Sequence, residues 1–376
     1  MGQPLAGVSL GQLSELGHTF RAMTSPLRLI DLFAGCGGLT AGFTSTASFE
    51  VIGAVEIDVY AAASYAANFG ADHMFVGDIA EWVRTGPPRA DVIIGGPPCQ
   101  GFSALGTRYN RDPRNALWRR YVETVAAAEP RAFVVENVGA FLRSGQFRSL
   151  RRETYRGGIL RDYRIEAGVL NAADYGTAQV RRRAIVIGTH RDLPPAGLPE
   201  PTHPEDRWVS VREALKGLPH RVSELSLPDT YVSILGRMVP GTFKHLDIHI
   251  SRRFTDLSAE RYRCIPAGGN RHDLPYHLQA PCWRDHTSGS VDVMGRLVWD
   301  RPSVTIRTEF HKPEKGRYLH PSEHRPLTHL EAARLQGFPD NFTWCGPKIA
   351  IARQIGNAVP VPLATAVAEH LVARLT

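Results

Sequence analysis

Residues 28–38 read Arg-Leu-Ile-Asp-Leu-Phe-Ala-Gly-Cys-Gly-Gly, an apolar run that leads directly into a cluster of glycines. The run predicts a buried strand over 28–33, and Gly35 and Gly37 permit the tight backbone turn that must follow it. A helix is expected from residue 38, with free amides in its first turn. A strand, a glycine-rich turn and a helix in this order predict an α/β fold with a ligand site at the turn.

The same alternation of strands and helices continues to residue 189. It predicts a mostly parallel sheet with helices on both faces. Only residues 171–179 separate the last two strands, which leaves no room for a crossover helix, so this pair should be antiparallel at one edge. We expect strands near 28–33, 50–55, 73–76, 91–95, 131–136, 163–170 and 184–189, and helices near 38–46, 58–69, 78–84, 114–129 and 144–158.

The composition changes after residue 189. Five prolines lie between residues 194 and 204, and the strand–helix rhythm is absent up to about residue 324. Helices expected near 328–336 and 350–374 then return to it. These changes predict a discontinuous catalytic domain over 27–189 and 325–376, an inserted domain over 190–324 with short β-like pieces at 295–299 and 303–307, and a frayed arm over 1–26.

A chain of 376 residues, of which 43% are hydrophobic, is long enough to bury one large core and a smaller one. Its apolar runs are too short to cross a bilayer, and its first residues lack the basic-then-apolar pattern of a secretion signal. Five cysteines are an odd number without paired spacing, which fits a reducing compartment. We therefore expect a cytoplasmic protein with no membrane partner; the resemblance described below further implies a bacterial one.

The positive charge is concentrated in one part of the chain. The net charge is +7, and residues 107–183 alone contain 16 arginines against 8 acidic residues. A positive surface of this kind suits a polyanionic substrate and predicts binding that weakens with salt. The alternative is a solvated basic face that serves solubility.

Cys99 follows the strand expected over 91–95. Residues 95–103 read Gly-Gly-Pro-Pro-Cys-Gln-Gly-Phe-Ser, so two prolines restrict the backbone before the thiol and Gly101 frees it afterwards. Catalytic groups of α/β proteins gather at this carboxyl edge of the sheet. The pattern therefore points to a nucleophile, with a small buried core residue as the alternative.

Two further segments bring charged groups to the same edge. The strand over 131–136 ends in Glu136, and partial burial would raise its pKa so that it donates a proton to a ring nitrogen. Alternation along an extended chain places Gln179, Arg181 and Arg183 on one face, where guanidiniums suit a thiolate, a carbonyl or a phosphate. The alternatives are a solvated strand-terminal acid and a basic edge strand that faces water.

The glycine turn also restricts the kind of cofactor. A nicotinamide dinucleotide site would place a third glycine at position 40, where this chain has Thr40. Glu56, 19 residues after Gly37, is expected at the end of the second strand, where it can bind ribose hydroxyls. Both features favour an adenosyl cofactor without a pyrophosphate.

The order of these segments resembles that of the cytosine-5 DNA methyltransferases, over about residues 27–375. The resemblance implies the Rossmann-like α/β sheet of class I S-adenosylmethionine-dependent methyltransferases, with an irregular, β-containing target-recognition domain inserted over 190–324. Eight blocks occur in the order typical of that family: Asp31–Gly38, Val55–Asp58, Gly77–Ile79, Pro98–Gln100, Glu136–Val138, Gln179-x-Arg181-x-Arg183, Arg325–Pro339 and Gln354–Pro360.

By this resemblance the cofactor is S-adenosylmethionine. Cys99 would add as a thiolate to carbon 6 of cytosine, Glu136 would bind its ring nitrogen N3 and amino group, and Arg181 and Arg183 would hold its carbonyl and a phosphate. Phe33 and Ile57 would flank the adenine, Asp78 would accept from its amino group, and Asn357 would close the methionine end. The expected cofactor residues are Phe33, Gly35, Gly37, Gly38, Glu56, Ile57, Asp78, Pro98, Asn357 and Val359.

The implied substrate is double-stranded DNA, from which the cytosine must be flipped out to reach Cys99. Residues 101–113 are expected to form a loop that closes over the base, with an ordinary surface loop as the alternative. We expect a monomer, and it stays open whether a restriction endonuclease acts on the same site without direct contact. The residues expected to contact DNA are Gln100, Ser103, Arg108, Arg111, Gln179 and Arg271.

Two other functions remain as alternatives, an RNA-directed enzyme that modifies transfer RNA and an inactive DNA-binding regulator. The long interval over 190–324 favours DNA, because duplex readout needs a sizeable recognition domain. The intact blocks disfavour an inactive regulator. We expect no metal, because the candidate ligands lack the paired spacing of zinc sites; they are Cys264, His272, His277, Cys282 and His286.

Overall fold

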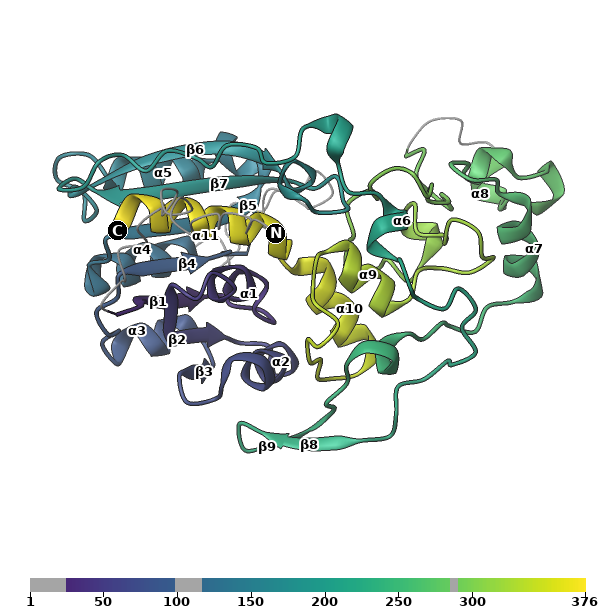
Figure 1. Ribbon diagram of the computed structural model, residues 1–376, viewed down its shortest axis with the longest axis horizontal. Helices are drawn as coiled ribbons and strands as arrows, with labels where there is room; N and C mark the ends of the chain where they lie inside the picture. Colours follow the sequence, from purple (N-terminus) through teal and green to yellow (C-terminus); the bar gives the residue numbers. More distant parts are fainter. Residues whose placement is uncertain (1–24, 99–116, 285–289) are drawn as a thin grey trace, which may run out of the picture.

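A computed structural model describes residues 25–98, 117–284 and 290–376, and its centre is a seven-stranded sheet (Figure 1). The strand order is β3-β2-β1-β4-β5-β7-β6, and β7 is antiparallel to both of its neighbours while the other pairs are parallel. The predicted sheet with an antiparallel edge pair is confirmed. The strands are β1 (Leu27–Leu32), β2 (Phe49–Glu56), β3 (Met74–Val76), β4 (Val92–Gly95), β5 (Ala132–Val138), β6 (Tyr163–Asn171) and β7 (Arg182–His190).

Helices cover both faces of the sheet, because alternate residues of each buried strand point to opposite sides. On one face Leu29 of β1 shares a core with α1 (Gly38–Thr44) and α11 (Val361–Leu375). On the other face Ile30 shares a core with α3 (Ile79–Arg84), α4 (Leu117–Ala128) and α5 (Gly145–Glu153). α2 (Val59–Phe69) lies beside the outer strands β2 and β3.

The single long helix expected over 350–374 is wrong. The segment forms two helices, α10 (Lys348–Asn357) and α11, with a bend of 42° between them. Pro360 explains the break, since proline has no amide to donate and disfavours helical angles in the residue before it. The break shapes the cavity described below, because Ala358 and Val359 in the break line it together with Asn357, the last residue of α10.

The inserted segment is less regular than the sheet. Its hairpin pairs β8 (Tyr231–Ile234) with β9 (Arg237–Pro240), and the expected β-like pieces at 295–299 and 303–307 contribute only single bridges, such as Arg296 to Leu319. The short helices of the inserted segment are α6 (Val211–Ala214), α7 (Asp256–Cys264) and α8 (Pro281–Arg284), with 3-10 turns η4 (Glu205–Arg207), η5 (His245–Ile248), η6 (Arg271–Asp273), η7 (Tyr276–Leu278) and η8 (Pro313–Lys315). Outside this segment lie helix α9 (His329–Leu335) and the 3-10 turns η2 (Gly139–Arg143) and η3 (Ala172–Tyr175).

α9 and α10 lie between the sheet and the inserted segment (Figure 1). One buried cluster joins Leu330 of α9 and Ile351 of α10 to inserted residues such as Phe243 and Phe310. Helices from the chain's last quarter thus complete the core of the inserted segment, while α11 returns to the sheet. The division into domains at residues 189 and 324 stays a prediction.

Within the described ranges no single helix is long and apolar enough to cross a membrane; only α10 and α11 taken together, across their bend, reach that length and composition.

Candidate active site

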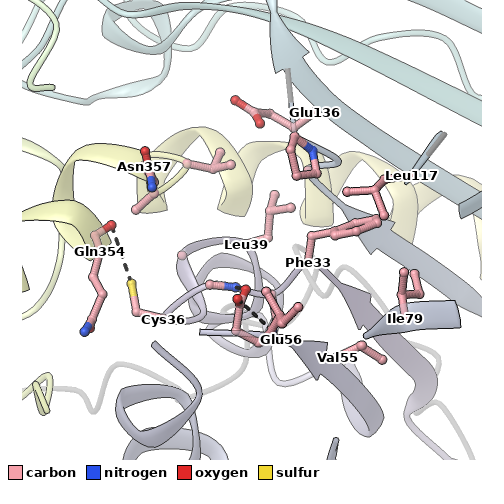
Figure 2. A pocket seen from close by; sticks show the side chains of 18 of the residues that line it. Phe33, Cys36, Leu39, Val55, Glu56, Ile79, Leu117, Glu136, Gln354 and Asn357 are labelled. Carbon is pink, nitrogen blue, oxygen red and sulfur yellow. Dashed lines mark hydrogen bonds between the residues drawn. The ribbon is translucent and has the colours of Figure 1, made fainter. Parts of the chain in front are cut away.

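A cavity of about 490 Å³ opens at the carboxyl edge of the sheet. Its walls come from the segments that follow β1, β2, β3 and β4, from the end of β5, and from the break between α10 and α11. Figure 2 shows apolar Phe33, Ile79 and Leu117 on one side of it and Gln354 and Asn357 on the other. The carboxyl ends of parallel strands meet at one edge, which brings residues 33 and 136 into one cavity.

Nine of the ten residues expected to bind a cofactor line this cavity: Phe33, Gly35, Gly38, Glu56, Ile57, Asp78, Pro98, Asn357 and Val359. The tenth, Gly37, precedes α1 with a φ of 93°, and a Cβ there would lie 2.3 Å from the ring of Phe69. Gly37 therefore serves the turn and its packing, whereas the other nine are placed to contact a ligand.

The sequence prediction missed part of the lining. Ile79 stands at a helix start, Leu39 one residue after one, and Leu117 is the first described residue of α4. Cys36 and Gln354 also line the cavity, with the Cys36 thiol 3.9 Å from the Gln354 carbonyl oxygen. An apolar residue at the start of a helix that follows a strand lies near the strand ends, so its position in the sequence could have predicted that it lines the cavity. The place of Gln354 beside residue 36 depends on the fold of a distant segment.

Three backbone amides hold the carboxylate of Glu56. The Gly35 N–H donates to Oε2 at 2.8 Å, and the N–H groups of Ile57 and Asp58 donate to Oε1 at 2.8 and 2.7 Å. Burial raises the pKa of Glu56, and these hydrogen bonds oppose that increase. Each carboxylate oxygen has two lone pairs, so Oε2 keeps one acceptor position for a ligand hydroxyl.

Asp31 lies fully buried behind the cavity. The hydroxyl of Thr40 donates to its Oδ2 at 2.6 Å and lies 3.1 Å from the hydroxyl of Tyr65, while Oδ1 finds no hydrogen-bond partner in the described part of the chain. Burial raises the pKa of Asp31 to about 7, against an opposing hydrogen bond from Thr40. The carboxyl group is therefore largely protonated below neutral pH.

Asp31→Asn should weaken the pH dependence of stability. The folded protein holds the Asp31 proton up to about pH 7, whereas an unperturbed aspartate releases it near pH 3.8. Between these values the unfolded state binds fewer protons, so stability falls as pH rises, by up to about 1.4 kcal/mol per pH unit. From pH 5 to pH 7 the free energy of unfolding in urea should fall about 2 kcal/mol more in wild type than in the variant. Equal falls would show that Asp31 is charged in the folded state.

Glu136 and Arg183 form an ion pair at the cavity. β5 and β7 are antiparallel with Val138 opposite Arg183, which brings the Arg183 Nε to 3.0 Å from Glu136 Oε1. Glu136 is 8% exposed, and burial raises its pKa while the charges of Arg183 and Arg181 act against the increase. The amide of Asn137 donates to the Pro97 carbonyl at 2.9 Å, so the turn that precedes Cys99 is tied to the same strand.

The structure places Gln179 and Arg181 inside the protein. Gln179 is fully buried, donates to the Leu335 carbonyl and the Gln336 side chain, and accepts from the Ile306 amide, so the expected DNA contact at Gln179 is wrong. Arg181 is 2% exposed and donates to the carbonyls of Ile306 and Gly356 at 2.8 and 3.0 Å. Both residues connect the end of the sheet to α9, α10 and the inserted segment.

Arg271, also expected to contact DNA, is 6% exposed in η6 and does not present its side chain to solvent. Cys99, Gln100, Ser103, Arg108 and Arg111, and the expected loop over 101–113, lie outside the described residues. Among the residues that are described, no three His, Cys, Asp or Glu side chains are grouped so as to hold a metal ion.

Comparisons with known proteins agree on one family. The model of the C-5 cytosine-specific DNA methylases matches residues 27–373. Type II methyltransferase M1.HphI of Haemophilus parahaemolyticus is 33% identical over 354 residues, which cover 91% of this chain and 86% of that protein. Type II methyltransferase M.XorII of Xanthomonas oryzae pv. oryzae is also 33% identical, over 94% of this chain and 86% of its own length.

A comparison with solved structures points to the same family. A crystal structure of a putative DNA modification methyltransferase encoded within an E. coli prophage superposes with a TM-score of 0.67 at 26% identity, covering 93% of this chain and 99% of that one. The family match spans the whole sheet, the ion pair of Glu136 and Arg183 and the segment at residue 357. The chain therefore belongs to the family of C-5 cytosine-specific DNA methylases.

Proposed function

We propose that this DNA (cytosine-5)-methyltransferase transfers the methyl group of S-adenosylmethionine to carbon 5 of a cytosine flipped out of a specific double-stranded DNA sequence. One observation carries the proposal: Glu136, held by Arg183 at 3.0 Å, lines the same cavity as Pro98, the residue before Cys99. An acid, a guanidinium and a thiol are the groups that activation of a cytosine ring requires.

The cavity fits the proposed cofactor in its chemistry. Phe33, Ile57 and Leu117 offer apolar surface for an adenine ring, and the free lone pair of Glu56 Oε2 offers an acceptor for a ribose hydroxyl. Asp78, which caps α3 through the Ala80 amide at 2.8 Å, keeps its second oxygen for an amino group. When bound, S-adenosylmethionine would supply an electrophilic methyl group at the end of the cavity near Glu136.

Carbon 5 of cytosine is a weak nucleophile because it belongs to an aromatic ring. Addition of the Cys99 thiolate to carbon 6 breaks the aromaticity and leaves carbon 5 enamine-like. Burial raises the pKa of Glu136 and so favours the protonated form, which donates to ring nitrogen N3 as negative charge develops there. Arg183 orients the Glu136 carboxyl group. Carbon 5 then takes the methyl group and loses its proton to a base such as water, while the bond from carbon 6 to the Cys99 sulfur breaks and the aromatic ring is restored.

Glu136→Ala should lower kcat for methyl transfer by about 10²–10³-fold, the usual effect of removing a proton donor from a site that stabilises charge. The raised pKa of Glu136 also predicts a pH profile, because the protonated form is active and is lost as pH rises through that pKa. In single-turnover assays the wild-type rate should therefore decline on the alkaline side. Glu136→Gln, which keeps an N–H donor without a titrating proton, should lack that decline; an identical pH profile in this variant would contradict the role of Glu136.

Base-resolution sequencing of 5-methylcytosine tests the proposed function directly. The protein is expressed in a host without cytosine methylation of its own, next to an empty-vector control. We expect methylation of one short sequence context in DNA, present with the protein and absent from the control. Unmethylated DNA from a folded protein that binds S-adenosylmethionine would overturn the proposal and return attention to an RNA substrate or a silent regulator.

We also propose a monomer in the cytoplasm. Light scattering coupled to size-exclusion chromatography checks the first property and cell fractionation the second. A companion restriction endonuclease can be sought in an extract of the source cells. If it is present, the extract should cleave unmethylated DNA at the sequence context that the sequencing identifies.

A further inference from the structure

An exposed row of arginines leads away from the cavity along α5. Arg143 ends η2, and Arg148, Arg151, Arg152 and Arg156 lie on or just beyond α5. The opposite side of the helix is buried through Phe147 and Leu150, so the arginines three and four residues apart lie on one outward face. We call these five arginines the α5 stripe.

The arginines of the stripe form no ion pairs within the described part of the chain. No carboxylate oxygen there lies within 4 Å of any of the five guanidiniums, although Glu153 ends the same helix, and the Arg148 Nη1 donates to the Arg143 carbonyl at 3.2 Å. Like charges three and four residues apart on a helix repel each other by a few tenths of a kcal/mol per pair. A face of this kind costs stability unless an anion neutralises it.

The helix dipole explains only part of this arrangement. Cations are favourable near the carboxyl end of a helix, which suits Arg151 and Arg152 in the last turn of α5. Arg143 and Arg148 lie at the amino end, where the same dipole disfavours positive charge. The helix dipole therefore does not explain the positive charge of these two residues, which an anionic ligand would explain.

The position of the stripe identifies that partner. β5 carries Glu136 to the carboxyl edge of the sheet, and η2 delivers Arg143 seven residues later at the same edge, where Arg182 at the start of β7 is also exposed. α5 then runs back toward the opposite edge, where β6 begins. Its nine residues extend about 14 Å, close to the length of four base pairs. When a duplex presents a base to Glu136, the phosphates on one side of that base would therefore lie along the positively charged arginines of the stripe.

We propose that the α5 stripe binds backbone phosphates of duplex DNA that flanks the target site, outside the sequence that is recognised. The inference rests on the proposed function, since it uses the duplex that delivers the cytosine. Its consequence is that affinity grows with the length of the flanking DNA and is sensitive to salt there.

Fluorescence anisotropy on two duplexes tests the proposal. Both carry one target context, and they are about 14 and about 40 base pairs long, which is about 48 and about 136 Å at 3.4 Å per base pair. Three variants are compared: Arg148→Gln/Arg151→Gln/Arg152→Gln, the charge-retaining Arg148→Lys/Arg151→Lys/Arg152→Lys, and a control that removes three exposed arginines elsewhere, Arg84→Gln/Arg237→Gln/Arg374→Gln.

Each lost phosphate contact lowers the slope of log K against log salt by about 0.9, so the glutamine variant should lose a slope of about 2–3 on the long duplex. It should bind and methylate the short duplex as wild type does, and the lysine variant and the control should keep most of the slope. An unchanged slope on the long duplex, or an equal loss on both duplexes, overturns the proposal. The two proposals fail in different ways. A wild-type protein that methylates neither duplex overturns the proposed function. The role of the stripe is still decided by how affinity depends on duplex length, because binding needs no turnover.

Discussion

Cys99→Ala should abolish methyl transfer, with a loss of more than about 10³-fold, the scale seen when an enzyme loses its nucleophile. The variant keeps the cavity, Glu136 and Arg183, yet without the thiol carbon 5 stays part of an aromatic ring. Pro98, the residue that precedes Cys99 in the sequence, lines the same cavity as Glu136. The Pro97 carbonyl, held by Asn137 at 2.9 Å, sets the direction from which the chain arrives.

A covalent trap separates the role of the thiol from a loss of folding. The duplex carries fluorine at carbon 5 of the target cytosine and is incubated with S-adenosylmethionine. After methyl transfer carbon 5 has no proton to lose, so the thiolate cannot leave and the adduct should persist through denaturing electrophoresis. Wild type and the control Cys264→Ala, which changes an exposed free cysteine, should form the denaturation-resistant band. Cys99→Ala should form none. A trapped band in Cys99→Ala, or more than a tenth of the wild-type rate, would assign the nucleophile to another residue.

Glu331→Gln should lower the free energy of unfolding by about 3–5 kcal/mol, the cost of leaving a buried charge without its partner. Arg325 donates to both oxygens of Glu331, from Nη1 to Oε2 at 2.9 Å and from Nη2 to Oε1 at 2.6 Å, and the Thr328 amide donates to Oε2 at 2.8 Å. Glu331 is 1% exposed and Arg325 6%. The pair fixes the start of α9 against the inserted segment, because Arg325 also donates to the His220 carbonyl.

The same pair predicts how its contribution changes with acid. Burial raises the pKa of Glu331, but the hydrogen bonds and charge of Arg325 more than offset this and lower the pKa to about 2. A lowered pKa means that the stabilisation is complete above about pH 4.5 and is lost as pH falls toward 2. Urea unfolding should therefore show a difference between wild type and Glu331→Gln that is constant from pH 7 to pH 5 and smaller at pH 3.

The matched control is Glu309→Gln, which removes a surface pair with Lys312 at 2.6 Å. Both side chains of that pair are more than a third exposed, so its loss should cost under about 1 kcal/mol. If Glu331→Gln cost no more than this control, the Arg325 pair would not hold α9 in place.

Local sequence patterns determined the central fold and much of the site. Apolar runs of strand length, separated by helical segments, predicted every strand of the sheet to within a few residues, because strand and helix periodicity are properties of adjacent residues. The same patterns put Glu56 and Glu136 at strand ends, and the topology of a parallel sheet was sufficient to bring them to one cavity.

Only the tertiary structure decided what the polar residues near the site do. Alternation predicted one shared face for Gln179, Arg181 and Arg183, but it did not indicate that Gln179 and Arg181 find their partners at Ile306 and Gly356, 127 and 175 residues away. The break at Pro360 and the core that α10 shares with the inserted segment depend on similarly distant contacts. Periodicity is a local property, whereas a buried polar group is satisfied by whichever distant segment the fold brings to it, which is why the sequence predicted the scaffold better than the roles of individual arginines.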